Sequence, residues 1–252
     1  MANMISAAAL FHRGDLRPAE GEVVVGLTPE REIELLRREG RAWNMVHAGT
    51  LGVDNDATIR HRVAIRAGVD GENAGHDDTP AAAEGSLQSD TGGFTWDAAT
   101  EGRERVVIDT PRTKAVIGFT DGDVFELGAV TIRPGATRQG WSTITVTLME
   151  GEQFGGAGRV LIAATGDVEN TSMGWKDATR TSVGRNWGEA PSLVEAAPAS
   201  VAVAVDSERV SAWALDERGQ RAEELQVASD DGRALLQLGP PYRTLWYEVE
   251  IR

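Results

Sequence analysis

The sequence predicts a mainly β protein, a β-sandwich of the jelly-roll or immunoglobulin-like kind with one short N-terminal helix. Three observations carry this prediction. Short segments with β-strand character recur after Gly93, turn residues separate them, and a single segment has clear start and stop signals of a helix. This spacing favours a β-sandwich over repeated strand–helix–strand units.

The N-terminal part combines strands with that helix. "GEVVVGL" (Gly21–Leu27) is a short apolar, β-branched run, which is typical of a buried strand. Thr28–Gly40 then begins with an N-cap threonine and a proline and ends with two arginines and a glycine, so it predicts a helix. Alternation over Ala57–Ala67 predicts a strand with His61 on its apolar face. Gly68–Gly93 has no period and is expected to be a long exposed loop.

Strand patterns dominate the rest of the chain. "STITVTLM" (Ser142–Met149) is the clearest, because Ile144, Val146 and Leu148 alternate with threonines. The other predicted strands are Phe94–Trp96, Arg105–Asp109, Lys114–Thr120, Val124–Ile132, Arg159–Thr165, Ser200–Val205, Arg209–Leu215, Glu224–Ala228, Ala234–Leu238 and Thr244–Ile251.

These elements suggest three segments. We expect residues 1–70 to form an αβ segment that packs on the sandwich and residues 71–190 to form the sandwich itself. Residues 191–252 would add antiparallel strands to the same sandwich or form a second small β domain. A long polar stretch, Asn170–Pro191, connects the last two segments and contains two tryptophans.

Charge and composition narrow the classes of partner. The 252 residues carry a formal net charge of -14, which argues against a nucleic-acid partner and against an anionic membrane surface. The absence of cysteine excludes disulfides, thiolate zinc sites and cysteine nucleophiles. No apolar run approaches the ~20 residues of a membrane helix, and the start lacks the basic region of a signal peptide. We therefore expect a soluble protein, secreted or cytoplasmic.

Candidate catalytic and metal-binding residues are carboxylates. A glycosidase needs two of them across a sugar cleft. No spacing selects a pair, and each available residue also suits a solvated surface group; the residues are Glu126, Glu152, Glu169, Glu189 and Glu195. Glu126, inside a predicted strand, is the preferred candidate for one of the pair. Asp54, Asp56, Asp121 and Asp123 offer hard oxygen ligands for a structural calcium ion, with plain turn residues as the alternative. No other cofactor is expected.

The seven tryptophans, against two tyrosines, suggest a ligand. Indole faces stack on the apolar face of pyranose rings, so tryptophans in loops suit carbohydrate binding. Trp141, Trp175 and Trp187 are candidate contacts, and Asn170 is placed to add an amide hydrogen bond beside Trp175. The Gly-Glu-Ala-Pro after Trp187 also suits an indole tucked under a turn. Of the others, Trp43 is predicted to lie in a loop or at an element end, and Trp96, Trp213 and Trp246 to lie in strands as part of the core.

Several strings also resemble a known family. "SDTGGFTWD", "VVIDTPRTKAVIGF", "RVLIAATGDVENTSMGW", "NWGEAPSLVEAAPASVAV" and "YRTLWYEVEI" occur here in that order. They resemble the region after the catalytic TIM barrel in large bacterial glycoside hydrolases of the cellulase, agarase and β-galactosidase-like kind. "ALFHRGDLRPAEGEVVVGLTPE" is similar to the segment that leaves such a barrel, so the resemblance covers about Leu10 to Arg252.

The resemblance implies a β-sandwich accessory region of a polysaccharide-degrading enzyme, with a TIM-barrel catalytic domain as its partner. In that family the barrel supplies the two catalytic glutamates. One predicted helix cannot build the eight βα units of a barrel, so no catalytic residue carries over to this chain.

Three functions follow as hypotheses. The first is a non-catalytic module of a glycoside hydrolase that binds a polysaccharide or oligosaccharide, or supports the barrel. The second is a β-sandwich glycoside hydrolase that acts with two carboxylates, one of them Glu126. The third is a purely structural or oligomerisation domain.

Overall fold

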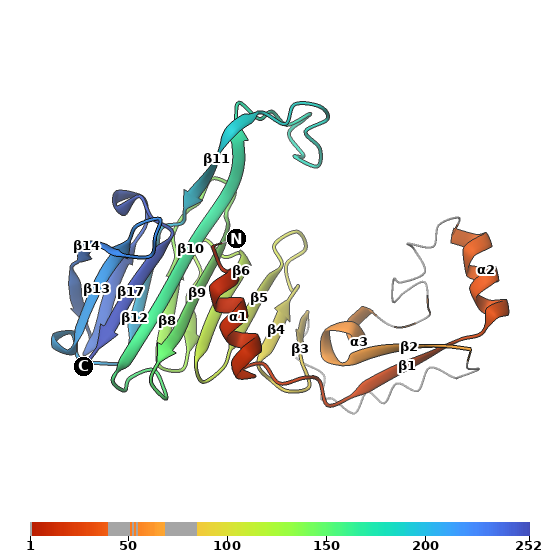
Figure 1. Ribbon diagram of the computed structural model, residues 1–252, viewed down its shortest axis with the longest axis horizontal. Coiled ribbons are helices and arrows are strands. Elements are labelled where there is room, and N and C mark those ends of the chain that lie inside the picture. The colour runs from red at the N-terminus through yellow and green to blue at the C-terminus, as the bar shows by residue number, and fades with distance from the viewer. Residues whose placement is uncertain (1, 40–50, 52, 54, 69–84) are drawn as a thin grey trace. The chain divides into compact units, whose positions relative to one another are not determined.

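The computed structural model (Figure 1) describes residues 2–39, 51, 53, 55–68 and 85–252. It is mainly β, with antiparallel sheets in a sandwich-like arrangement and a short N-terminal helix, as the sequence predicts. The chain divides into two compact units. Met1–Asp15 joins Val107–Arg252 in the first unit, and Leu16–Val106 forms the second. We expected boundaries near residues 70 and 190. The observed boundaries follow residues 15 and 106, because the first 15 residues belong with the sandwich.

The first unit contains one α-helix, two 3-10 turns and the main set of strands. The helices are α1 (Met4–Arg13), η2 (Ser207–Arg209) and η3 (Pro240–Tyr242). The strands are β5 (Arg105–Asp109), which begins at the boundary, β6 (Thr113–Phe119), β7 (Phe125–Leu127), β8 (Val130–Pro134), β9 (Trp141–Glu150), β10 (Gly158–Thr171), β11 (Glu189–Ala196), β12 (Ala199–Val203), β13 (Val210–Leu215), β14 (Arg221–Leu225), β15 (Val227–Asp230), β16 (Arg233–Leu238) and β17 (Trp246–Ile251).

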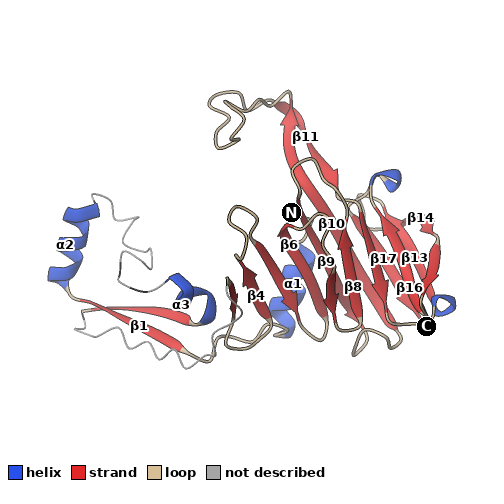
Figure 2. Cartoon of the chain, turned by 180° about the vertical axis from the view of Figure 1, so that it is seen from behind, coloured by secondary structure: helices blue, strands red, loops and turns tan. Residues whose placement is uncertain are grey.

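Two sheets make the sandwich (Figure 2). In this unit one sheet has the order β14-β13-β17-β10-β9-β6-β5, with β11 paired to β10, and the other has the order β15-β16-β12-β8-β7. Strands from residues 191–252 lie in both sheets, beside strands from the middle of the chain. The last quarter of the sequence therefore completes the same sandwich.

The core lies between the sheets and follows the predicted alternation. Ile144, Val146 and Leu148 on β9 are at most 1% exposed. They pack with buried residues of the facing sheet, such as Ile132 and Leu236. Alternate residues of each strand thus form the two inner faces, which is the usual construction of a sandwich core.

Helix α1 covers the outer, threonine-bearing face of β9. Leu10 and Ser6 are buried there, and the hydroxyl oxygens of Ser6 and Thr145 lie 3.0 Å apart. The sequence of this helix, "MISAAALFHR", is apolar on nearly every side and shows no clear period, so it does not predict a helix.

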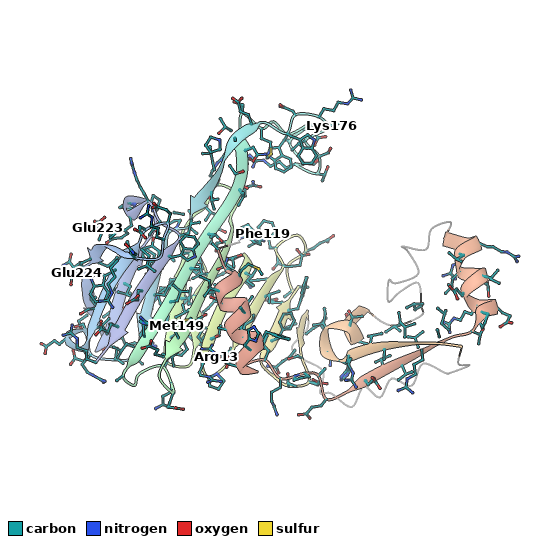
Figure 3. The ribbon with its side chains drawn as sticks, viewed as in Figure 1. Arg13, Phe119, Met149, Lys176, Glu223 and Glu224 are labelled. Carbon is teal, nitrogen blue, oxygen red and sulfur yellow. The ribbon has the colours of Figure 1, made fainter. Side chains whose placement is uncertain are left out.

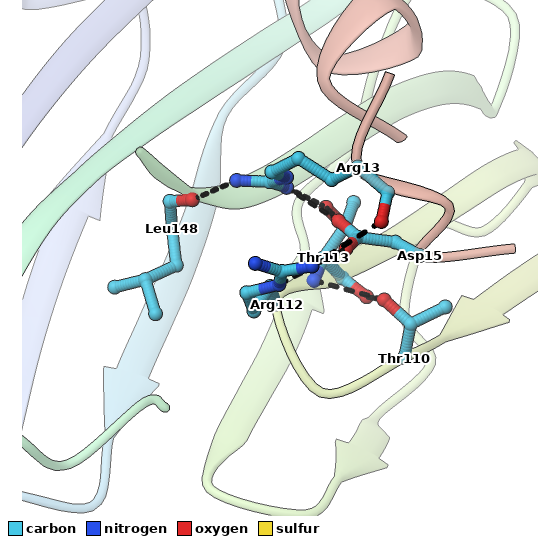
Figure 4. A network of polar contacts seen from close by, with 6 residues as sticks. All are labelled: Arg13, Asp15, Thr110, Arg112, Thr113 and Leu148. Carbon is cyan, nitrogen blue, oxygen red and sulfur yellow. Dashed lines mark hydrogen bonds and ion pairs between the residues drawn. The ribbon is translucent and has the colours of Figure 1, made fainter. Parts of the chain in front are cut away.

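A polar network at the end of α1 fixes the helix to the sheet (Figure 4). The carboxylate of Asp15, 2% exposed, accepts hydrogen bonds from Arg112 Nε at 3.0 Å and from Arg13. Arg13 also donates to the carbonyl of Leu148 and, at 3.2 Å, to the hydroxyl of Thr113. Because the carboxylate is buried, its charge would be uncompensated without these two arginines.

The second unit is a small αβ structure. Strand β1 (Glu22–Leu27) pairs in parallel with β2 (Arg62–Ala67), and the small core between these strands and α2 includes Val23, Val25 and Leu35. Its other elements are α2 (Pro29–Glu39), α3 (Asn55–Arg60), β3 (Ser86–Gln88) and β4 (Phe94–Asp97). The predicted threonine cap is confirmed, since Thr28 Oγ1 accepts a hydrogen bond from the N–H of Arg31 at 3.2 Å.

The predicted strand over Ala57–Ala67 is wrong in its first half. Residues up to Arg60 form α3, and the N–H of His61 donates to the carbonyl of Ala57 at 2.9 Å, as in a helix. Contacts with Asp90 fix Arg60 and His61 at the end of α3. These tertiary contacts outweigh the alternation of apolar and polar residues that predicted a strand. The predicted loop Gly68–Gly93 contains β3, and its residues 69–84 lie outside the described part of the chain.

Other differences between the predicted and the observed strands come from turns and from the edge of a sheet. Val124–Ile132 is a hairpin, because Gly128 adopts a positive φ of 61° between β7 and β8. Glu224–Ala228 divides between β14 in one sheet and β15 in the other. The connection expected over Asn170–Pro191 is shorter, because β10 extends to Thr171 and β11 begins at Glu189. The proline of β11 is tolerated because β11 pairs with β10 alone.

The tryptophans predicted for the core lie nearer the surface. Trp96 is 36% exposed. Trp213 is half-buried on the outer face of its sheet, with the guanidinium of Arg221 at 3.6 Å from its ring centre. Trp246 is half-buried and donates from Nε1 to the carbonyl of Ala2 at 3.0 Å. Trp43 lies outside the described residues.

A buried carboxylate joins three segments of the second unit. Asp90 Oδ2 accepts a hydrogen bond from the N–H of Gly21 at 2.7 Å and lies 3.0 Å from Nδ1 of His61. Burial alone would raise the pKa of Asp90, but the hydrogen bonds from Gly21, His61 and the N–H of Glu20 lower that pKa below its ordinary value.

We therefore expect the second unit to lose stability in acid through Asp90. A carboxylate with a lowered folded-state pKa stabilises above its unfolded pKa of about 3.9, and this contribution is lost as pH falls through the folded value. Hydrogen exchange, corrected for intrinsic rates, should show falling protection of the Gly21 amide and its neighbours in β1 below about pH 4. In Asp90→Asn this protection should already be low and should change little with pH. The same pH dependence in both proteins would contradict this assignment.

Candidate functional site

The candidate site lies where β10 extends beyond its neighbour β9. The two strands pair up to Thr165↔Thr143, but β10 continues to Thr171 and pairs there with β11 alone. This two-stranded extension, which we call the arm, leaves the body of the sandwich and carries the loop of residues 172–188 at its end (Figure 1).

A pocket of about 360 Å³ opens beside the base of the arm. Phe119 and Trp141 form one wall, since they are cross-strand partners at the ends of β6 and β9. Trp175, from the loop, contributes a second indole. Trp141 is 37% exposed and Trp175 is half-buried, so both rings keep accessible surface. The remaining lining residues are Gln139, Gly166, Asp167, Val168 and Arg180.

The loop that carries Trp175 is tied to itself and to the arm. Trp175 Nε1 donates to Glu169 Oε1 at 2.8 Å, which fixes the orientation of the indole. Within the loop, the N–H of Lys176 donates to the carbonyl of Ser182 at 2.8 Å. Hydrogen bonds from the side chain and backbone of Thr179 lower the pKa of Asp177. Lys176 itself points away from the sandwich at the end of the arm (Figure 3).

Two arginines and two acids surround the indole of Trp175. Asp167 and Glu169 lie on one face of β10, with side chains 14% and 15% exposed. Arg138 Nη1 lies 3.3 Å from Glu169 and 3.8 Å from Asp167. Arg180 Nη1 lies 3.7 Å from Glu169 and 4.0 Å from Asp167, and its guanidinium lies 6.0 Å from the ring centre of Trp175. The charges at the pocket are therefore largely paired.

Glu195 on β11 holds the base of the arm in shape. Its Oε1 accepts from the N–H of Arg138 at 2.9 Å, and its Oε2 accepts from the N–H of Asp167 at 3.1 Å. The carboxylate lies against Gly166, where a Cβ would stand 2.4 Å from Oε2, so a larger residue would make the Glu195 side chain shift. Glu195 thus positions two residues of the site through their backbone.

Two of the four predicted ligand contacts, Trp141 and Trp175, share the pocket. Trp187 does not line it and is 65% exposed, so the indole is not tucked under a turn. Asn170 does not line it either. Its amide donates to the carbonyl of Trp187 at 2.9 Å and accepts from Ser192 Oγ at 2.6 Å, which closes the loop onto the arm. Asn170 therefore supports the loop.

The catalytic and metal candidates lie elsewhere. Glu126 is on the edge strand β7 with its side chain 67% exposed, 3.9 Å from Arg233 and 3.4 Å from the hydroxyl of Thr131. Asp121 and Asp123 occupy the turn between β6 and β7, and Asp56 lies in α3. Within the described ranges no group of three or more His, Cys, Asp or Glu side chains could hold a metal ion. The fourth aspartate, Asp54, lies outside those ranges.

The sequence offered Glu169 and Glu195 only among several carboxylates, and it did not single out Asp167, Arg138 or Gln139. The predicted strand ended at Thr165, which left Asp167 and Glu169 in an unstructured connection. Their spacing of two was an available signal, because it places both acids on one face of an extended strand. The contribution of Arg138, Gln139 and Glu195 comes from long-range pairing and has no local signal.

Comparison of the chain with protein-family models, with curated proteins and with solved structures gives no match. Within the described part of the chain, every helix is too short or too polar to span a membrane.

Substitution of Gly166 tests the construction of the arm base. In Gly166→Ala the new methyl group displaces the Glu195 carboxylate and breaks its two backbone hydrogen bonds, which should lower the free energy of unfolding by ~1–3 kcal/mol. Gly156→Ala is the control, because its Cβ meets nothing closer than 3.5 Å, and its effect should stay within about 0.5 kcal/mol. Urea denaturation measures both.

A double-mutant cycle sharpens this test. Once Glu195→Ala has removed the carboxylate, adding Gly166→Ala should cost little, so the two effects should not add. Additive losses would show that the glycine is required for another reason.

Proposed function

We propose that the sandwich is a non-catalytic carbohydrate-binding module that holds a sugar ring in the pocket between Trp141 and Trp175. One observation carries the proposal. Two indoles that are separated in sequence, together with Phe119, line a single open pocket that also offers a carboxylate, an amide and a guanidinium. Aromatic faces with a few fixed polar groups are the usual composition of a small-ligand site and suit a pyranose ring.

The surroundings of the pocket support binding without large rearrangement. Phe119 and Trp141 are fixed by strand pairing, and Trp175 by its bond to Glu169. A preformed site loses less conformational entropy on binding, which favours affinity. The resemblance described above adds the setting. In that setting the module would accompany the catalytic barrel of a polysaccharide-degrading enzyme and would bind polysaccharide or oligosaccharide chains.

A second candidate, a β-sandwich glycoside hydrolase, is favoured by Asp167 and Glu169 on one face of β10 near the pocket. Against it, Glu169 already binds the Trp175 indole and Arg138, so it serves to position other groups. Release of reducing ends from the glycans tested below, lost in Glu169→Gln, would favour this candidate.

Paired tryptophan variants from one loop test the proposal. The protein should be retained on at least one of insoluble cellulose, xylan and agarose, and a soluble oligosaccharide of that glycan at ~100 times its Kd should stabilise it by about 2.7 kcal/mol. Trp175→Ala should weaken binding about tenfold or more, because the stacking face is lost.

Trp187→Ala is the matched control. Its indole is 65% exposed and lies outside the pocket, while the backbone carbonyl that Asn170 binds is retained. Its affinity should stay close to that of the unaltered protein. No retention on any glycan and no thermal shift would refute the proposed function, and equal losses in both variants would refute the location.

A further inference from the structure

One oxygen at the pocket lacks a hydrogen-bond donor. Asp167 Oδ1 accepts from the N–H of Val168 at 2.9 Å. Asp167 Oδ2 is buried and accepts no hydrogen bond from the described residues. Its nearest cationic atoms, on Arg138 and Arg180, lie 3.8 and 4.0 Å away, beyond hydrogen-bonding distance. A buried carboxylate oxygen without a donor is costly, so a donor supplied by a ligand would be favoured.

Asp167 Oδ2 is closed to a water-sized group in the present arrangement, with Arg180 Nη1 4.0 Å away. Arg180 is an exposed residue of the loop, so its side chain can shift. Once Arg180 has shifted, a ligand hydroxyl can donate to Asp167 Oδ2 at the usual hydrogen-bond length of about 2.8 Å and accept from the displaced guanidinium.

The charge around this gap disfavours an anion. Asp167, Glu169 and Glu195 contribute −3, and Arg138 and Arg180 contribute +2, which gives a formal charge of −1. The chain as a whole carries -14. A carboxylate or sulfate on the ligand would meet a like charge on Asp167 and would compete for the arginines that pair with it.

From these contacts we propose that the pocket selects neutral sugars over uronic or sulfated ones, and that Asp167 makes the selection by accepting a ring hydroxyl. This inference rests on the proposed carbohydrate-binding function and names the class of sugar. Trp141 and Trp175 hold the ring through its apolar face, which neutral and charged sugars share. Asp167 therefore decides between the two classes.

The test compares neutral oligosaccharides with counterparts in which the C6 hydroxymethyl group is oxidised to a carboxylate. Isothermal titration calorimetry would use cellohexaose, xylohexaose and agarohexaose, and cellohexaose and agarohexaose oxidised at C6 to uronic acids. We expect a neutral oligosaccharide to bind about tenfold or more tightly than its oxidised form. Asp167→Asn keeps the shape but presents a donor in place of the acceptor, so it should weaken neutral binding about tenfold and should reduce or abolish the preference.

Glu223→Gln is the control for charge, because it removes one negative charge on β14, at the far edge of the sheet (Figure 3). It should change neither affinity nor preference, and circular dichroism should show both variants folded. Equal or tighter binding of the oxidised sugars would overturn the inference but leave the proposed function in place. A preference that persists in Asp167→Asn would also overturn it. Absence of binding by every oligosaccharide would overturn both.

Discussion

The site depends on the unequal lengths of two neighbouring strands. Trp141 is the first residue of β9, and β9 does not extend further in this direction along the sheet. β10 runs on there through residues 166–171 with no β9 partner. Backbone N–H and C=O groups that leave a sheet need other partners. β11 supplies them on one side, and the Glu195 carboxylate binds the N–H of Asp167 at the point of departure. The space left where β9 stops is the space in which the pocket forms.

This arrangement places a rigid wall opposite an adjustable one. Phe119 and Trp141 belong to paired strands of the sandwich, so the sheet fixes their backbone positions. Trp175 and Arg180 belong to the loop, whose bonds are largely internal or to the arm. A sugar ring would therefore meet a preformed aromatic face and be closed in by a loop that needs only small adjustments.

The sequence suggested two roles for the loop of residues 172–188, a ligand contact at Trp175 and an indole at Trp187 tucked under a turn. Trp175 lines the pocket and is held by Glu169. That bond and the one from Asn170 to the Trp187 carbonyl both attach the loop to the arm, whereas the Trp187 indole remains exposed. The composition indicated that the aromatic residues of this polar loop either contact a ligand or attach the loop. It could not indicate which residue holds the loop, because that depends on the backbone geometry of the arm.

The sequence predicted the sandwich well, because the alternation of apolar and polar residues along a strand indicates which face of the strand is buried. Ile144, Val146 and Leu148 lie inward as their period of two requires. Prediction failed where tertiary contacts decide. His61 lies at a helix end because Asp90 binds it there, and Glu189–Ala196 forms a strand because β10 offers an edge. Of the candidate contacts named from the sequence, Trp141 and Trp175 line the pocket. Asp167 was not among those candidates, because its place at the pocket depends on the extension of β10.

The indole N–H resonances of the tryptophans test the central claim most directly. In a 1H–15N titration with the neutral oligosaccharide that binds, the assigned Nε1–H signals of Trp141 and Trp175 should shift together with a single dissociation constant. Those of Trp187 and Trp213, which lie outside the pocket, should stay in place. Shifts at Trp187 or Trp213 with none at Trp141 and Trp175 would contradict the account.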